Sequence, residues 1–295
     1  MVTAHEQGRR AIAGGQSVYW QAWLPQDPAR AVVVLVHGIH EHSARYTYVG
    51  ARLAAAGFAV YAADHRGHGR SDGRRANIER MALLQQDLRS FVRFAAGRHP
   101  GPLFMVGHSL GGLIALMYAT DGEATEGALD GLVLSGPAVL ATAGSALAKR
   151  LAPVLSALVP DLGVASIDAE DKISRDPDVV RSYRDDPLVH RGKIKARTGA
   201  EILAVMQGLP ARLRRLSVPL LVLHGTDDQI CPLAGSVMVH EAVSSTDKTL
   251  RRYPGLYHEV FNEPEREQIL TDLISWLNDR SASASVGAAG FTPCV

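Results

Sequence analysis

The sequence predicts an α/β protein in which helices flank a mostly parallel, doubly wound sheet and a helical cap is inserted. Short apolar runs alternate with helical patterns along the chain, and strands separated by helices pair in parallel. Between the runs at 132–135 and 219–224, about eighty residues lack a buried strand pattern, which is too many for a plain connection. These two observations favour one α/β core with one insertion.

The elements of the core follow from the apolar pattern in chain order. Residues 17–24 (SVYWQAWL) predict an early antiparallel strand, and the β-branched run at 31–36 (AVVVLV) predicts a strand buried on both faces. Further strands are expected at 58–63, 103–106, 132–135, 219–224 and 249–253, and helices at 46–56, 81–99 and 265–279.

The interruption also sets the predicted domain boundaries. Residues 1–139 and 216–280 are expected to form the core, and residues 140–215 the cap. The cap contains an apolar stretch at 147–162, expected to pack on one side and stay exposed on the other, and a second helix at 198–209. The small and polar residues 281–295 predict a disordered tail.

Composition excludes several classes of protein. The 295 residues include 31 basic and 30 acidic side chains, so no basic surface for nucleic acid is expected. No apolar run is long enough to cross a bilayer, and the polar N-terminus lacks a secretory signal. Cys231 and Cys294 give no disulfide framework. We therefore expect a cytoplasmic protein, with peripheral contact at a membrane or cell envelope as an alternative.

The strand at 103–106 runs into Gly107-His108-Ser109-Leu110-Gly111, the G-x-S-x-G form of a nucleophile elbow. The turn between strand and helix is so tight that Gly107 and Gly111 must be small, and it lifts the Ser109 hydroxyl over a helix N-terminus. In a chain with 28 glycines, the alternative is an ordinary turn with an N-cap serine.

A serine nucleophile needs a general base and an acid that orients it, in the chain order serine, acid, histidine. Asp227 and Asp228 follow the strand at 219–224, and both remain candidates for the acid. His258 lies on a loop before the closing helix and is the candidate base. The structural alternatives are a turn-forming aspartate and a surface histidine.

An oxyanion hole needs two backbone amides directed at one point. The amide of Leu110 follows the serine, and that of Ile39 follows Gly38 in the loop after the strand at 31–36. The nearby histidines could instead bind a metal, but we expect structural loops, no metal and no cofactor. They are His37, His40, His42, His65 and His68.

Five blocks together resemble the monoacylglycerol lipases of the α/β-hydrolase superfamily. In chain order they are HGIHEHSARY (37–46), DHRGHGRSDG (64–73), GHSLGG (107–112), HGTDDQICP (224–232) and YHEVFNEPER (257–266). The resemblance selects Asp228 over Asp227 as the acid, and supports Ser109, His258 and the Ile39 and Leu110 amides. It also implies a mobile cap that guides an acyl chain to the serine.

The resemblance implies hydrolysis of monoacylglycerol, with Glu41 and Arg45 as tentative contacts to the alcohol or as an ion pair that holds the loop. Phe261 stands where animal members of the family carry a second histidine. Alternatives on the same scaffold are a lysophospholipase, a general carboxylesterase or an aminopeptidase-like enzyme. A non-catalytic binding module is a further alternative. An exposed apolar side of the cap would also allow contact with a membrane or micelle.

Overall fold

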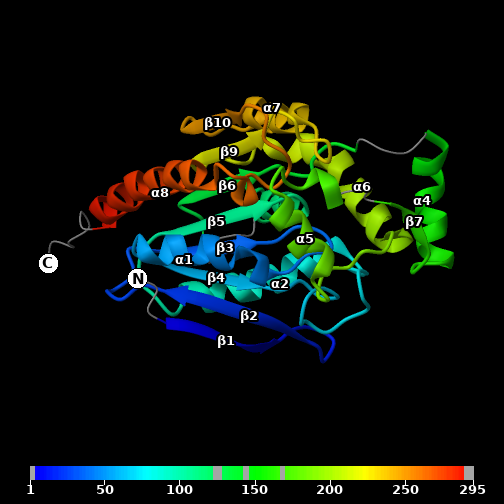
Figure 1. The fold of residues 1–295 in the computed structure, drawn as a ribbon, viewed down its shortest axis with the longest axis horizontal. Coiled ribbons are helices and arrows are strands. Elements are labelled where there is room, and N and C mark those ends of the chain that lie inside the picture. Colours follow the sequence, from blue (N-terminus) through cyan, green and yellow to red (C-terminus); the bar gives the residue numbers. More distant parts are fainter. Residues whose placement is uncertain (1–3, 122–127, 142–145, 167–169, 289–295) are drawn as a thin grey trace, which may run out of the picture.

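The computed structural model describes residues 4–121, 128–141, 146–166 and 170–288, with the backbone alone described at 146–151 and 283–288. Among these residues, eight strands form one sheet in the order β1-β2-β4-β3-β5-β6-β9-β10. β2 is antiparallel to β1 and β4, and the other pairs are parallel. The predicted doubly wound sheet and the antiparallel strand at 17–24 are therefore confirmed (Figure 1).

The strands are β1 Ala4–Ala11, β2 Ser17–Leu24, β3 Ala31–Val36, β4 Phe58–Ala63, β5 Leu103–His108, β6 Gly131–Ser135, β9 Leu220–Gly225 and β10 Lys248–Tyr253. The helices of the core are α1 Thr47–Ala55, α2 Met81–Ala96, α3 Leu110–Ala119, α7 Leu233–Ala242 and α8 Arg266–Ala288, and short 3₁₀ turns lie at Ser43–Tyr46 and Val260–Asn262.

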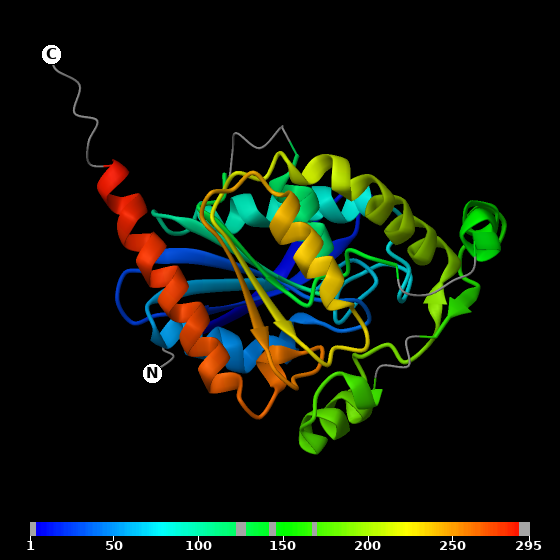
Figure 2. The same ribbon diagram turned by 90° about the horizontal axis from the view of Figure 1, so that it is seen from above.

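The sheet separates two apolar layers because alternate side chains of a strand point to opposite faces. Val32 and Val34 of β3 pack with α2 and α3, whereas Val33 and Leu35 pack with α1 and α8. Figure 2 shows α8 and α6 on opposite sides of the sheet. Every residue of β3 is buried, as expected for a central parallel strand.

The segment between β6 and β9 contains α4 Ala146–Leu158, α5 Pro177–Asp185 and α6 Ala196–Leu213, a 3₁₀ turn at Glu170–Lys172, and a short antiparallel pair of β7 Gly163–Ala165 with β8 Ile194–Lys195. It lies at the end of the sheet where the parallel strands terminate (Figure 1). Leu209 and Leu213 of α6 are fully buried in the same cluster as α2 and α3, so the C-terminal part of α6 packs on the core.

The structure adds one strand at the N-terminus and corrects the predicted start of the C-terminal tail. The polar N-terminal residues form β1, an edge strand stabilised by pairing along its whole length with β2. Helix α8 continues to Ala288, so the predicted start of a tail at residue 281 is wrong; Ser281 is buried and its hydroxyl donates to the Leu277 carbonyl. Residues 289–295 lie outside the described residues.

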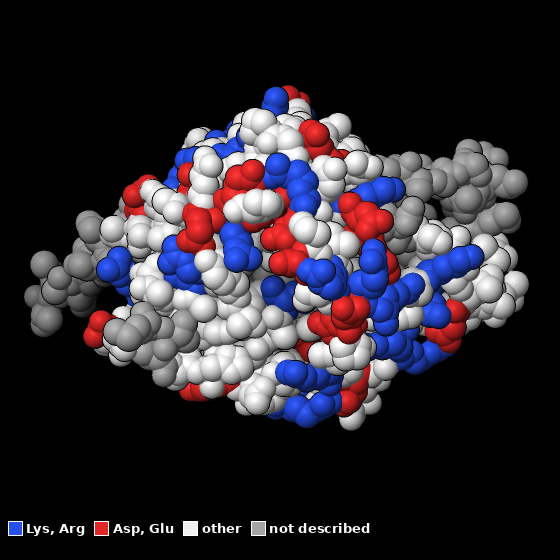
Figure 3. All heavy atoms as spheres, in the orientation of Figure 1, with Lys and Arg blue, Asp and Glu red and all other residues white. Residues whose placement is uncertain are grey.

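Basic and acidic side chains are interspersed over the face drawn in Figure 3, in keeping with the balanced composition. None of the helices within the described ranges combines the length and the apolar character that a transmembrane segment needs.

Candidate active site

Ser109 occupies the turn between β5 and α3, with φ of 52° and ψ of −119°. This conformation is strained for a residue with a side chain and is held by its surroundings. A Cβ on Gly111 would overlap the carbonyl oxygen of Val36, and one on Gly107 would lie 2.6 Å from the Gly111 oxygen. The two glycines therefore allow α3 to start directly against the ends of β3 and β5, as the elbow motif predicts.

Asp228 and His258 meet at the carboxyl ends of β9 and β10. His258 Nδ1 donates to Asp228 Oδ2 at 2.8 Å, and His224 Nε2 lies 3.2 Å from the same oxygen. Asp228 Oδ1 accepts from the amides of Ile230 and Cys231 at 2.8 and 2.9 Å. The carboxylate is thus surrounded by donors, and its orientation is fixed on both sides.

The neighbouring Asp227 is placed differently. It is exposed, and its Oδ1 accepts from the Thr226 hydroxyl at 2.9 Å. The two aspartates that the motif alone left open are therefore separated by the turn after β9. Of the two, Asp228 is the one whose carboxylate contacts His258.

The Asp228–His258 pair shifts the pKa of each partner. Burial raises the pKa of Asp228, but the attraction of His258 and hydrogen bonds from His224, His258 and the Cys231 amide outweigh burial and leave the pKa below its ordinary value. Burial lowers the pKa of His258, but the Asp228 carboxylate outweighs this effect and leaves the pKa above 6.5. His258 and Ser109 line the same cavity.

The amides of Ile39 and Leu110 have the placement expected of oxyanion donors. Leu110 is the first residue of α3, so its amide has no acceptor within the helix. A Cβ on Gly38, just before Ile39, would lie 3.2 Å from the Ser109 Cβ, which puts this loop beside the serine. Among the described residues, neither amide donates a hydrogen bond within the protein.

A buried ion cluster holds the loop after β3. Glu41 Oε1 accepts from the Gly38 amide at 2.6 Å, and Glu41 Oε2 accepts from Arg45 Nη1 at 2.9 Å. Arg45 also makes two hydrogen bonds, of 2.6 and 2.7 Å, to the carboxylate of Glu259, directly after His258. Both tentative alcohol-side residues, Glu41 and Arg45, thus bridge the oxyanion loop to the loop of the candidate base.

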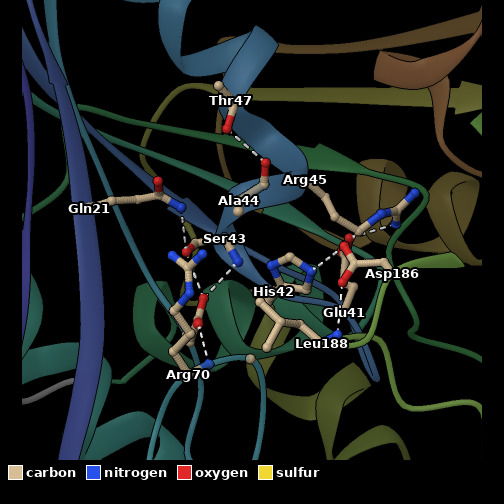
Figure 4. Close-up of polar contacts among 12 residues, drawn as sticks. Gln21, Glu41, His42, Ser43, Ala44, Arg45, Thr47, Arg70, Asp186 and Leu188 are labelled. Atoms are coloured by element: carbon tan, nitrogen blue, oxygen red, sulfur yellow. Dashed lines mark hydrogen bonds and ion pairs between the residues drawn. The ribbon is translucent and has the colours of Figure 1, made fainter. Parts of the chain in front are cut away.

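A second set of contacts fixes the other side of this loop (Figure 4). The Ser43 amide and hydroxyl both donate to Asp64 Oδ1, at 2.8 and 2.6 Å, and Gln21 Nε2 donates to the Ser43 hydroxyl at 2.8 Å. Asp64 Oδ2 accepts from the Arg70 amide at 2.8 Å. The loop is therefore tied to β2 and to the segment after β4.

The segment between β6 and β9 closes over the loop. His42 Nε2 lies 2.9 Å from Asp186 Oδ2, as Figure 4 shows, and the His190 amide donates to the His40 carbonyl at 2.9 Å. The Tyr183 ring of α5 lies 4.6 Å from the Arg45 guanidinium carbon. The cavity at Ser109 measures about 30 Å³, which leaves room for no more than a few water molecules.

Comparison with known proteins agrees with this geometry. A family model described as "Serine aminopeptidase, S33" matches residues 27–265. A monoacylglycerol lipase of Mycolicibacterium smegmatis is 45% identical over 269 residues, covering 90% of this chain and 95% of the relative. The chain belongs to the monoacylglycerol lipase family. The resemblance carried by the five sequence blocks is thereby confirmed.

Other members of the monoacylglycerol lipase family are similar over comparable lengths. Human monoglyceride lipase is 33% identical, with 94% of this chain and 91% of the human protein covered. The crystal structure of Paleococcus ferrophilus monoacylglycerol lipase superposes with a TM-score of 0.80 at 33% identity, covering 89% and 99% of the two chains. The predicted α/β-hydrolase fold is therefore confirmed.

Two residues of this family member were missed by sequence reasoning. His224 lies one residue before the end of β9 and contacts Asp228, and Glu259 lines the cavity while it binds Arg45. The signal available in the sequence was that Glu259 directly follows His258 and that His224 lies four residues before Asp228.

Two other residues named in the sequence analysis are buried. Phe261 packs in the apolar layer of α1 and α8, and Cys231 is buried, where desolvation raises its thiol pKa.

The histidines near the oxyanion loop brace one another. His37 Nδ1 donates to the Gly38 carbonyl, and its Nε2 accepts from the His65 amide at 2.9 Å. Burial lowers the pKa of His65 to about 4 and of His68 to about 3, so both rings are neutral at pH 7. Within the described ranges, no three His, Cys, Asp or Glu side chains are placed to hold a metal ion.

Proposed function

We propose that the protein hydrolyses monoacylglycerol to glycerol and a fatty acid through an acyl-enzyme on Ser109. The observation that carries the proposal is the strained elbow serine in the same cavity as His258, which is hydrogen-bonded to Asp228. Membership of the monoacylglycerol lipase family supports the choice of substrate.

The proposed reaction uses each group in turn. Ser109 Oγ attacks the ester carbonyl while His258 Nε2 takes its proton, and the amides of Ile39 and Leu110 hold the negative oxygen. Asp228 keeps the His258 proton on Nδ1 and stabilises the imidazolium. The proton then passes to the leaving glycerol oxygen. Water attacks the acyl-enzyme by the same route, which releases the fatty acid and restores the serine.

The base role of His258 predicts the pH dependence of kcat/KM. A general base must be neutral, and Asp228 holds the pKa of His258 above 6.5, so activity should fall as the pH drops through a value higher than 6.5. A pH profile with an uncharged ester measures this limb. Histidines whose pKa is lowered, such as His65 and His68, cannot produce it. A limb near pH 4 would contradict the assignment of His258.

We further propose that residues 140–215 form a cap whose outer surface contacts a lipid interface. Large apolar side chains are exposed there, although Leu147 and Leu151 of the predicted stripe lie outside the described side chains. The exposed residues are Val154, Leu158, Val159, Leu162 and Val164. Figure 3 shows uncharged atoms at the end of the molecule where α4 and β7 lie in Figure 1. Such a patch favours partition into a membrane surface.

Leu158, which is 76% exposed, gives a test of this surface. Burying a leucine in an apolar phase contributes about 1.5–3 kcal/mol, so Leu158→Ser should weaken binding to phospholipid vesicles about tenfold or more. Co-sedimentation with vesicles measures the loss. Tyr48→Ser is the matched control, because Tyr48 is 40% exposed on α1, away from the cap. Equal binding by both variants would contradict the proposed contact.

Fatty-acid release from mono-, di- and triacylglycerols of one chain length tests the proposed substrate, with Ser109→Ala as the blank. We expect a strong preference for the monoester, because the small cavity has to open for even one acyl chain. Equal or faster release from the larger lipids, or from a lysophospholipid of the same chain length, would reject monoacylglycerol as the substrate.

A further inference from the structure

Two carboxylates share one nitrogen of Arg45 at the edge of the cavity. Arg45 Nη1 donates to Glu41 Oε2 at 2.9 Å and to Glu259 Oε1 at 2.6 Å, so these oxygens lie no farther apart than the sum of the two distances. Glu41 and Glu259 both line the cavity with Ser109 and His258. Two carboxylate oxygens are therefore held side by side, next to the candidate nucleophile and base.

Each of these two oxygens has an acceptor position left. A carboxylate oxygen accepts about two hydrogen bonds. The other oxygen of Glu41 accepts from the Gly38 amide and the Tyr46 hydroxyl, and the other oxygen of Glu259 accepts from Arg45 Nη2 and Asn262 Nδ2. Among the described residues, Glu41 Oε2 and Glu259 Oε1 each accept the Arg45 bond alone.

The charge around this pair favours ligands that donate hydrogen bonds. At Glu41, burial and the nearby Glu259 carboxylate outweigh Arg45 and raise the pKa. At Glu259, Arg45 outweighs burial and holds the pKa below its ordinary value, so this group is ionised at pH 7. Among the described lining residues Glu41 and Glu259 are acidic and none is Lys or Arg. A neutral alcohol gains acceptor oxygens here, whereas a phosphate brings negative charge beside the ionised Glu259 carboxylate.

We propose that Glu259, together with Glu41, forms the acceptor site for the free hydroxyls of an uncharged polyol head group and disfavours phosphate-bearing head groups. The inference rests on the proposed hydrolase function and adds the residue that decides between neutral and anionic lipids. It makes Glu259 a specificity-determining residue, distinct from the groups that move protons.

Three esters of the same acyl chain test the inference: 1-monoacylglycerol, the propyl ester, and 1-acylglycerol 3-phosphate. Wild type should hydrolyse them with kcat/KM falling in that order. Glu259→Gln should lower the ratio of glycerol ester to propyl ester about tenfold, because a hydrogen bond to a charged acceptor becomes one to a neutral amide. In the same variant, kcat/KM for the phosphate ester should rise relative to kcat/KM for the propyl ester. Glu259→Asp, which keeps the charge, should retain part of both preferences.

Glu265→Gln is the matched control, because the Glu265 carboxylate is 44% exposed and pairs with Arg175 outside the cavity. This variant should keep the wild-type kcat/KM ratios of glycerol ester to propyl ester and of phosphate ester to propyl ester. Thermal unfolding of each variant shows whether the fold is intact. If Glu259→Gln lowers kcat/KM equally for all three esters, or leaves the ratios between them unchanged, the inference is overturned and the proposed function stands. A wild-type enzyme without preference for the glycerol ester overturns the proposed function itself, whatever the variants do.

Discussion

Ser109→Ala is expected to lower kcat for monoacylglycerol by about 10⁴- to 10⁶-fold. The substitution removes the oxygen that we propose attacks the ester, and it leaves the two proposed oxyanion amides and the cavity in place. It keeps the Cβ, so the strained backbone at φ 52° should be retained. Release of radiolabelled fatty acid under single-turnover and steady-state conditions measures the loss.

A fluorophosphonate probe gives an independent check of the same residue. Wild type should be labelled covalently once per chain at Ser109, and the alanine variant should remain unlabelled while unfolding at a similar temperature. Turnover within tenfold of wild type, or labelling of the variant, would show that another nucleophile carries the reaction.

Asp228→Asn is expected to lower kcat about 10⁴-fold, because the amide forces the wrong tautomer of His258. The Ile230 and Cys231 amides donate to Oδ1, so the asparagine oxygen stays there and its NH₂ group faces His258. His258 Nδ1 must then accept a hydrogen bond, which moves the ring proton to Nε2. A protonated Nε2 cannot take the proton from Ser109.

Asp227→Asn is the matched control, one residue away in the same loop. Asp227 is exposed, and its carboxylate accepts from Thr226, a bond that an asparagine oxygen can also accept. The change in kcat should stay within about twofold. Steady-state kinetics on both variants decides between the two aspartates. A severe loss of kcat in Asp227→Asn together with a mild loss in Asp228→Asn would show that Asp227 is the acid and contradict our assignment.

The elbow and the sheet could be predicted from the sequence because their determinants are local. The spacing of Gly107, Ser109 and Gly111 reports a turn that only small residues permit, and uninterrupted apolar runs report strands buried on both faces. The two adjacent aspartates could not be separated locally, because the turn that directs one inward and the other outward depends on β9 and its neighbours.

Other features depend on contacts that no local pattern reports. Glu259 binds Arg45, which lies 214 positions away in the chain, and an isolated glutamate after a histidine gives no sign of that partner. Strand β1 is polar because it is an edge strand that buries little, so its pairing with β2, not its own composition, makes it a strand. The small residues after Asp279 continue α8, and Ser281 is buried although its own type predicts an exposed tail.

The loop that carries Ile39 also holds the segment between β6 and β9, through contacts of His42 with Asp186 and of His40 with His190. Since the cavity at Ser109 measures only about 30 Å³, we expect an acyl chain to bind there only when these contacts loosen. We therefore expect substrate entry and ordering of the Ile39 loop to be coupled, because the same residues, His40 and His42, hold both the loop and the segment between β6 and β9.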